Sequence, residues 1–410
     1  MSIPHLFRCP ISLDIFTDPV TLCTGQTYDR QCIERWLADG HRTCPVTMQA
    51  LGDATALVPN RTLRHLIDRW LSAATTDQQH LPDSGSDQDP SLAALKRCLQ
   101  SDATTATAAT KIAALEKVMA LASESDVGRA CMLQLGFLPV LLPLVFRTAT
   151  AATLAPSDRR RAVVGEEELA LQCVLGLMPC TSAAPQLDCL NMLKKEAHLA
   201  SFVRLLERGS GRAKAGLCRL LETVATATAT RDLALIVAAS PRVWQALLPL
   251  LQQHDGPASD PRASEAAVRA IAAVCAAEPA RGSAIHHGVV GALFRHLSWW
   301  DYGKGGGGAV SCALAAVETL AETEAGRRAV ARAPGATRVL VRHVFMMSSS
   351  NDGSEHAAAA LLSVCRESRA ARSEAVGAGV VTQLLLLLQS QCGARAKAKA
   401  RALLKLLKSR

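Results

Sequence analysis

The chain has 410 residues, too many for one ordinary hydrophobic core, so several domains or a repeat array are expected. Apolar residues make up 49% and charged residues 20%, a composition that excludes a disordered chain. Only 3% are aromatic, so the core must be built from Leu, Val and Ala, which favours closely packed helices. The sequence has no secretory signal pattern and no apolar run of the ~20 residues that a membrane-spanning helix needs.

Charge is unevenly distributed along the chain. Residues 1–90 hold 7 basic and 11 acidic residues, a balance of −4, whereas residues 91–410 hold 38 basic and 25 acidic residues, a balance of +13. The positive part has neither the interleaved aromatic residues of a single-strand binder nor a nucleic-acid motif. We therefore expect a solvated basic helix face and no nucleic-acid partner.

The 14 cysteines are expected to be free thiols rather than disulfides. Most lie among apolar neighbours, as in Ala272-Ala273-Val274-Cys275, and thiols in the cytosol are kept reduced. Their predicted role is that of small buried hydrophobic residues.

The first fifty residues contain a series of closely spaced motifs. In chain order these are Cys9-Pro10-Ile11-Ser12-Leu13-Asp14, Asp18-Pro19-Val20, Gly25-Gln26-Thr27-Tyr28-Asp29-Arg30, Ile33-Glu34-Arg35-Trp36-Leu37 and Cys44-Pro45-Val46-Thr47-Met48-Gln49. Over about residues 4–75 the chain resembles a U-box, the metal-free relative of the RING finger in ubiquitin ligases. The resemblance implies a small α+β domain at residues 1–75 and a ubiquitin-charged conjugating enzyme as its partner.

The cysteines of this segment do not have the spacing of zinc ligands. Cys9, Cys23, Cys32 and Cys44 are separated by 14, 9 and 12 positions, and no Cys-x-x-Cys pair occurs in the chain. Even with His5 and His41 the segment lacks the ligands for two tetrahedral zinc sites. We expect no metal and no cofactor.

No cysteine of the segment is predicted to act as a nucleophile. Cys9 and Cys44 each precede a proline at a turn and have no obvious base nearby. We therefore expect no catalytic residue and no covalent ubiquitin intermediate on this chain.

Polar side chains must then brace the module in place of metal, provided that each buried polar group finds a partner. The candidates are Asp14, Asp18, Thr27, Arg30, Glu34 and Gln49.

The resemblance also implies which residues contact the conjugating enzyme. In the U-box family two loops and the central helix form a shallow apolar groove that docks this enzyme. Matching the motifs assigns Ile11 and Leu13 to the first loop, Trp36 to the helix and Pro45 to the second loop. Burial of Trp36 within the module's own core is the alternative.

One position departs from the family pattern. Many members place a basic residue three positions after the second-loop proline, where it bonds both the enzyme and ubiquitin. Here that position is Met48, which donates no hydrogen bond. Either Gln49 or Arg42 takes over this role, or activation is weaker.

A helix is predicted after the U-box-like motifs. Leu63, Leu66, Ile67, Trp70 and Leu71 fall on one helix face, and Asn60 precedes them as a suitable N-cap. Residues 76–90 are rich in Asp, Ser and Gln and predict a flexible linker.

From residue 91 onward the pattern is helical and repetitive. Junction glycines recur at Gly136, Gly288, Gly335 and Gly379, and the last three are 47 and 44 residues apart. Ser240-Pro241 marks the same junction 48 residues before Gly288. A tight turn between helices often needs the positive φ that glycine allows.

These repeats resemble armadillo repeats. The resemblance implies an all-α solenoid of about six repeats over residues 91–410, and an irregular helical bundle is the alternative. Residues 148–168 are polar and charged, and we expect a surface loop there. The last segment, residues 395–410, carries seven basic residues and no acid. It is predicted to be the final solenoid helix, with binding to a membrane surface or an acidic partner as the alternative.

The expected architecture is multidomain and mostly α, with a U-box followed by an armadillo-like solenoid. It implies a RING-type ubiquitin ligase that docks a charged conjugating enzyme and holds a protein substrate on the repeats. The segments Ile3-Pro4-His5-Leu6-Phe7 and residues 44–49 are similar to a plant stress- and immunity-related subgroup, and the expected compartment is the cytoplasm, with the nucleus as a second one. The alternative is a non-catalytic armadillo scaffold with a weakened U-box.

Overall fold

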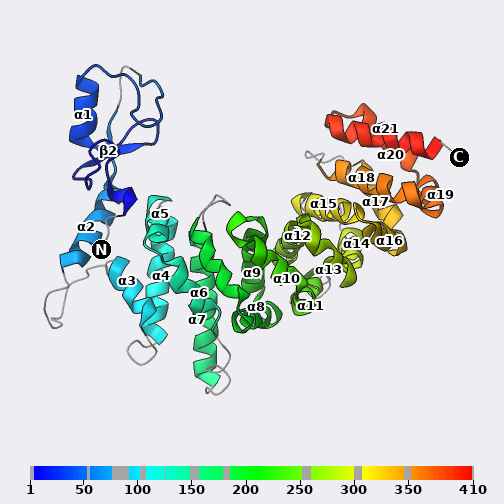
Figure 1. The fold of residues 1–410 in the computed structure, drawn as a ribbon, viewed down its shortest axis with the longest axis horizontal. Helices are drawn as coiled ribbons and strands as arrows, with labels where there is room; N and C mark the ends of the chain where they lie inside the picture. Colours follow the sequence, from blue (N-terminus) through cyan, green and yellow to red (C-terminus); the bar gives the residue numbers. More distant parts are fainter. Residues whose placement is uncertain are drawn as a thin grey trace. The chain divides into compact units, whose positions relative to one another are not determined.

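A computed structural model describes residues 4–52, 56–75, 92–101, 108–124, 126–147, 157–178, 185–251, 260–299, 307–345 and 352–408. The chain forms two compact units, Met1–Cys180 and Thr181–Arg410 (Figure 1). This division falls inside the predicted repeat region. The predicted linker at 76–90 lies outside the described residues and stays a prediction.

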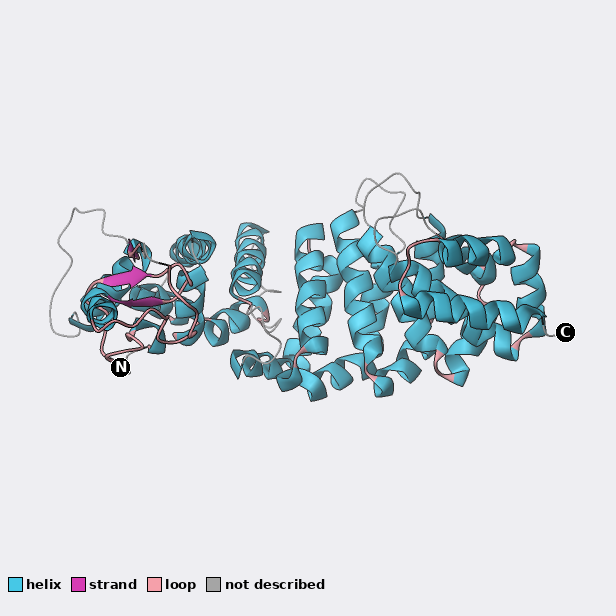
Figure 2. Cartoon of the chain, turned by 90° about the horizontal axis from the view of Figure 1, so that it is seen from above, coloured by secondary structure: helices cyan, strands magenta, loops and turns pink. Residues whose placement is uncertain are grey.

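The first unit opens with a small mixed module. A 3-10 turn, η1 (His5–Phe7), precedes strands β1 (Pro19–Thr21) and β2 (Thr27–Asp29), helix α1 (Arg30–Ala38) and strand β3 (Val58–Pro59). The strands form an antiparallel sheet in the order β2-β1-β3, with Val20 opposite both Tyr28 and Pro59 (Figure 2). Phe7, Val20 and Tyr28 are fully buried in this module.

Helix α2 (Arg61–Thr75) confirms the helix predicted after the U-box-like motifs. The Asn60 side chain accepts the Leu63 amide proton at 3.0 Å, so Asn60 is the N-cap. Leu63, Leu66, Ile67 and Trp70 are buried, as the predicted face requires. Trp70 packs edge-to-face on Phe7 with ring centroids 5.7 Å apart, which ties the helix to the start of the module.

The rest of the first unit is helical. It contains α3 (Leu92–Gln100), α4 (Ala108–Glu124), α5 (Asp126–Gln134), α6 (Leu138–Val145) and α7 (Ser157–Leu177). The surface loop predicted at 148–168 is wrong from Ser157 onward, because α7 begins there. The arginines and glutamates of this stretch are good helix formers, and charged residues do not end a helix as Gly and Pro do.

The second unit consists of five successive repeats, each with two shorter helical segments followed by a long helix. They are η2 (Pro185–Lys194), α8 (Glu196–Arg208) and α9 (Gly211–Thr226); η3 (Thr228–Thr230) with α10 (Arg231–Ala239), α11 (Pro241–Leu247) with η4 (Leu248–Leu251), and α12 (Pro261–Ala276); α13 (Glu278–His286), α14 (Val289–Trp299) and α15 (Gly307–Ala321); α16 (Glu324–Arg332), α17 (Ala336–Val344) and α18 (Asp352–Glu367); and α19 (Arg369–Gly377), α20 (Val380–Gln389) and α21 (Ala394–Lys408). With α5–α7 these make six complete repeats among the described residues, and α3 with α4 adds a helix pair before them.

The long third helices of the second unit pack on one another in sequence. Helix α12 contacts α9 and α15, and α18 contacts α15 and α21 (Figure 1). Small residues make this close packing feasible, since Ala267, Ala313 and Ala358 are fully buried. The solenoid prediction is therefore confirmed over the irregular bundle.

The junction glycines lie between the first and second helices of their repeats. Gly136, Gly288, Gly335 and Gly379 have φ values of 73°, 81°, 68° and 82°, in the left-handed region that glycine tolerates. Ser240 makes the equivalent turn differently, with an extended backbone before Pro241. The predicted reason for the glycines is confirmed.

In three successive repeats, an arginine of the first helix links the repeat to the one before it. Arg281, Arg327 and Arg372 are 46 and 45 residues apart, and each donates to a carbonyl at the end of the preceding third helix. The acceptors are the carbonyls of Cys275, Ala321 and Cys365. These guanidinium groups satisfy carbonyls that have no partner within their own helix.

The cysteines in the described part of the chain are all free. Eight are buried, which agrees with their predicted role as small core residues, and Cys23 is an exposed exception.

Candidate docking site

Two loops of the N-terminal module have the same backbone conformation. In the first, residues 9–14, the Cys9 amide donates to the Asp14 carbonyl and the Leu13 amide to the Cys9 carbonyl, both at 2.8 Å. In the second, residues 44–49, the equivalent bonds join Cys44 to Gln49 and Met48 to Cys44, both at 2.9 Å. A β-bridge closes each loop, Arg8 to Ile15 and Thr43 to Ala50.

The fifth residue of each loop adopts a left-handed backbone. Leu13 has φ 62° and Met48 has φ 58°, and no other non-glycine residue in the described ranges has a positive φ. Large side chains rarely adopt this conformation because it costs free energy. Both loops use it to turn an apolar side chain outward.

Four apolar side chains of the two loops are exposed. Their exposed fractions are 37% for Ile11, 65% for Leu13, 51% for Val46 and 69% for Met48. Pro45, the predicted contact in the second loop, is less exposed than these four and is half-buried. The two loops thus present matched pairs of apolar side chains, and sequence analysis had not selected Val46.

Trp36 lies half-buried on α1. Its indole N–H donates to the Thr43 carbonyl at 2.9 Å, and its ring stacks on His41 with centroids 3.9 Å apart. Trp36 therefore holds the segment that enters the second loop, while part of its ring faces solvent. It is not buried in the module's core, as the alternative had it.

Adjacent residues of β2 connect the module to both loops. The Tyr28 hydroxyl accepts the Val46 amide proton at 3.2 Å and lies 3.0 Å from the Cys44 sulfur. The Asp29 amide donates to the Cys9 sulfur at 3.3 Å. Tyr28 thus braces the second loop and Asp29 the first, through bonds that need no metal ion.

The Asp29 carboxylate anchors the segment that follows the first loop. It is buried and accepts the Thr17 and Asp18 amide protons at 2.6 and 3.1 Å. Sequence analysis missed both Tyr28 and Asp29. Both residues lie in the quoted motif Gly25–Arg30, but nothing local in the sequence marks them as bracing residues.

Four of the six predicted bracing residues take part in side-chain contacts. Arg30 pairs with Asp18 at 2.6 Å and with Glu34 at 3.6 Å. The Thr27 hydroxyl lies 2.9 Å from the Thr21 hydroxyl and accepts a hydrogen bond from the side-chain amide of Asn60 at 3.2 Å. Asp14 and Gln49 instead have exposed side chains and contribute main-chain carbonyls to the loops.

The Cys44 sulfur acts as a hydrogen-bond acceptor. Burial favours its neutral thiol, but hydrogen bonds from Thr24, Thr47 and Tyr28 outweigh burial and lower the pKa of Cys44 to about 6. The side chain is fully buried, so no substrate reaches it. This geometry gives Cys44 a structural role rather than that of a nucleophile.

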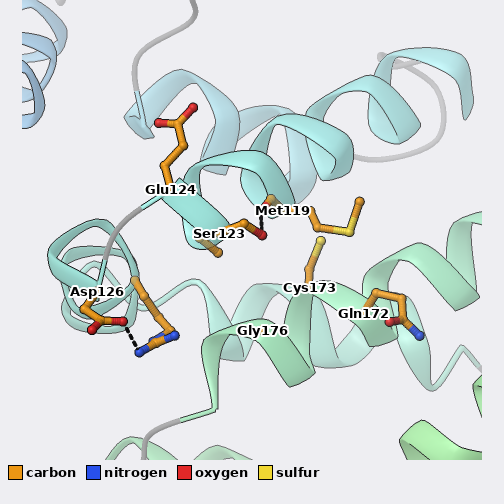
Figure 3. Close-up of a pocket in the computed structure, with 9 residues that line it drawn as sticks. Met119, Ser123, Glu124, Asp126, Gln172, Cys173 and Gly176 are labelled. Atoms are coloured by element: carbon orange, nitrogen blue, oxygen red, sulfur yellow. Dashed lines mark hydrogen bonds and ion pairs between the residues drawn. The ribbon is translucent and has the colours of Figure 1, made fainter. Parts of the chain in front are cut away.

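The repeat region of the first unit contains a pocket of about 360 Å³ between α4, α5 and α7 (Figure 3). Met119 and Cys173 line it from facing helices, and an Asp126–Arg129 ion pair lies at its edge. The Cys173 thiol donates to the Leu115 carbonyl at 3.2 Å, and burial raises its pKa to about 12. This thiol is therefore not activated as a nucleophile.

The described ranges contain no group of three His, Cys, Asp or Glu side chains that could hold a metal ion. Within the same ranges no single helix is long and apolar enough to cross a membrane, although three sharply bent helix pairs pass a test of length and composition.

Known proteins match both parts of the chain. A family model described as the U-box domain matches residues 3–76, and one described as the plant U-box protein ARM repeat region matches residues 93–410. U-box domain-containing proteins 26 and 25 of Arabidopsis thaliana are each 34% identical, over 100% of this chain and 92% of their own length. The E3 ubiquitin-protein ligase PUB23 of Arabidopsis thaliana is 28% identical, over 99% of this chain and 93% of its own.

Among solved structures, a designed armadillo repeat protein covers 66% of this chain and 100% of its own, at 18% identity and a TM-score of 0.47, a level too low to support any statement about function. The two family models and the full-length relatives together decide the classification. The chain belongs to the plant U-box protein family, with a U-box domain followed by an armadillo repeat region.

Proposed function

We propose that this chain is a ubiquitin ligase whose U-box docks a ubiquitin-charged conjugating enzyme on the two loops and on Trp36. The proposal is supported by the family, by relatives named as E3 ubiquitin-protein ligases, and above all by one observation. The two identically folded loops expose Ile11, Leu13, Val46 and Met48 on a module that has its own buried core.

The proposed surface suits a small, transient interface. Apolar side chains on braced loops lose little conformational entropy on binding, and one indole ring supplies a large contact area. Pro45 stiffens the second loop beside Val46. Tyr28 and Asp29 act as positioning residues, because they hold the loops without contacting the partner.

The proposed mechanism relies on orientation. The docked enzyme carries ubiquitin as a thioester, and a substrate amine attacks the carbonyl carbon as the enzyme's cysteine thiolate departs. The U-box increases the rate by holding the thioester in a reactive pose near the amine. The side chains of this chain supply no nucleophile, in keeping with the buried Cys44.

Met48 occupies the position where many relatives of this fold carry a basic residue. Its exposed thioether contributes apolar contact but donates no hydrogen bond to ubiquitin. Gln49 and Arg42 are exposed neighbours that can donate one. We infer that the activity of this chain depends more on docking, and less on this hydrogen bond, than the activity of family members that carry a basic residue at this position.

The armadillo repeats are the proposed substrate-binding part. The repeat region carries the +13 balance, so an acidic protein surface is the favoured substrate chemistry. The proposal places the reaction in the cytoplasm or nucleus, in stress or defence signalling. The compartment and the signalling role are proposed from the similarity of the N-terminal motifs alone.

A non-catalytic scaffold with a weakened U-box is the second candidate, and Met48 is the observation that favours it. An in vitro reaction of the full chain with ubiquitin, activating enzyme and a panel of conjugating enzymes separates the two. Ubiquitin chains that require the full chain and at least one conjugating enzyme support the ligase. No reaction with any enzyme of the panel supports the scaffold.

A further inference from the structure

The last repeat in the described residues leaves an apolar helix face open to solvent. On α20, Val381 is 40% exposed, Leu385 49% and Leu386 38%. Exposed single apolar residues are common, but Val381 and Leu385 lie one turn apart on one face of a short helix and Leu386 follows on its adjoining side, so the group calls for an explanation.

The junction glycine aligns α20 with the second helices of the two preceding repeats. Val381 and Leu385, two and six residues after Gly379, correspond to Thr337 and Val341 on α17, which are 7% and 3% exposed. Helix α17 packs against α20, the second helix of the next repeat. Positions covered by a neighbouring helix on α17 are therefore open on α20.

The same comparison holds one repeat earlier. Val290 and Phe294 on α14 lie two and six residues after Gly288, and both are buried. Helix α14 packs against α17, so again a second helix lies alongside. The open face of α20 has the shape and chemistry of a surface on which one more helix packs.

A further position is polar on α14 and α17 but apolar on α20. Seven residues after the junction glycine, α14 has Arg295 and α17 has Arg342, whereas α20 has Leu386. Terminal repeats usually carry a polar outer face. Leu386 adds a third exposed apolar side chain to α20.

The neighbouring helix supplies a charge signal. Helix α21 packs against α20 and contains no acidic residue (Figure 1). Arg401, Lys405 and Lys408 are exposed and lie three or four residues apart, which places them on one stripe of the helix. The helix that packs against α20 thus carries exposed cations and no acid.

We propose that the open face of α20 and the basic stripe of α21 bind an acidic amphipathic helix of a partner protein. Its apolar side would pack on Val381, Leu385 and Leu386, as a following repeat would. Its carboxylates would pair with the exposed cations of α21. A second copy of this chain fits less well, because it would bring two basic stripes together. A helix is favoured over a lipid surface because helices cover the equivalent positions on α14 and α17. This surface is separate from the proposed U-box docking site.

The test measures binding by the full chain and needs no ligase activity. The probe is a fluorescent peptide of about 18 residues, long enough for partial helicity in water, with Leu on one face and Glu elsewhere. A scrambled peptide of the same composition and a peptide with Lys in place of Glu are the controls. Anisotropy at low and physiological salt gives the affinities.

We expect binding of the acidic amphipathic peptide, weaker binding at higher salt, and no binding of either control peptide. Leu385→Glu should weaken binding about tenfold or more, and the double variant R401E/K405E should do so through charge alone. Ile236→Glu is the matched control, since Ile236 is a 41% exposed apolar residue of α10 in the same unit. It should leave binding unchanged. Circular dichroism confirms that each variant is folded.

Three results would overturn the proposal. One is a failure of the acidic peptide to bind, or binding of this peptide that none of the α20 and α21 variants alters. Another is sedimentation of the chain with phosphatidylserine-containing vesicles, lost in Leu385→Glu, without peptide binding, which would assign the face to lipid. The third is a dimer in light scattering that Leu385→Glu dissociates, which would assign the face to a second copy.

Discussion

The Tyr28 hydroxyl accepts the Val46 amide proton at 3.2 Å and is hydrogen-bonded to the Cys44 sulfur at 3.0 Å. A single side chain of the sheet therefore fixes the first three residues of the second loop. Because this loop presents Val46 and Met48, the brace connects the interior of the U-box to its proposed docking surface.

Tyr28→Phe should loosen the second loop. It removes only the hydroxyl, so the Val46 amide loses its partner and the Cys44 sulfur loses one of its hydrogen bonds, at a cost of about 1–2 kcal/mol. We expect faster hydrogen exchange at the amides of residues 44–49 and lower autoubiquitination. Thr21→Val is the control, because it removes the 2.9 Å contact to Thr27 on the same sheet without touching the loop. Equal protection in the Tyr28 variant and the wild type would remove the brace from the account.

Met48→Arg should raise the rate of ubiquitin transfer. The change places a hydrogen-bond donor where Met48 has none, on a position that is 69% exposed. Met48→Leu is the control, since it keeps an apolar side chain of similar size and the same backbone constraint. Single-turnover transfer to free lysine measures the effect. An arginine variant no faster than the leucine variant would mean that Gln49, Arg42 or docking alone sets the rate.

Arg327→Ala should destabilise the second compact unit. Arg327 donates to the Ala321 and Glu322 carbonyls at 3.3 and 2.8 Å and pairs with Glu367 at the end of α18 in its own repeat, so its loss leaves helix-end carbonyls without partners. We expect a loss of roughly 1–2 kcal/mol in the free energy of unfolding. Its neighbour Arg328 makes only an exposed pair with Glu324, and Arg328→Ala should cost less than about 0.5 kcal/mol. Urea unfolding followed by circular dichroism compares the two variants. Similar losses of unfolding free energy in both would contradict the role of Arg327 in linking successive repeats.

His343 should make the second unit sensitive to acid. The side chain is fully buried, and burial together with the Arg342 charge lowers its pKa to about 4. Because the folded state favours the neutral form, this stabilisation is complete above the unfolded pKa of about 6.5 and is lost as pH falls towards 4. Between pH 7.5 and 5 the loss from this group should be roughly 2 kcal/mol.

His343→Gln should flatten this dependence, whereas His286→Gln, at an exposed position, should not. Urea unfolding midpoints at the two pH values measure both variants. A pH dependence that persists in His343→Gln would assign the acid sensitivity to other groups.

Much of the fold could be predicted because its signals are local. The junction glycines mark a backbone conformation that few other residues tolerate, and the Leu63–Trp70 face has helical periodicity. The helix at Ser157 was missed because charged residues are as common in exposed helices as in loops. The positions of Ile11, Leu13 and Trp36 followed from resemblance, since nothing local distinguishes a docking leucine from a core leucine.

The bracing of the site could not be predicted in the same way. Cys44 and Val46 lie 16 and 18 residues from Tyr28, and no periodic pattern joins them. The equivalence of Leu13 and Met48 is likewise invisible in the sequence, because their side chains differ and only their shared left-handed backbone reveals it. Pairings set by tertiary structure need coordinates.

The central claim, that the two loops and Trp36 form the docking surface, is tested most directly by ubiquitin discharge from a charged conjugating enzyme. The full-length chain is compared with its Ile11→Ala, Trp36→Ala and Val58→Ala variants, the last an equally apolar, exposed residue of β3 outside the loops. Loss of a docking anchor worth about 2 kcal/mol predicts a roughly thirtyfold slower discharge for Ile11→Ala and Trp36→Ala at subsaturating enzyme, with Val58→Ala near wild type. Wild-type discharge rates in both the Ile11 and Trp36 variants, with their fold intact by circular dichroism, would contradict it.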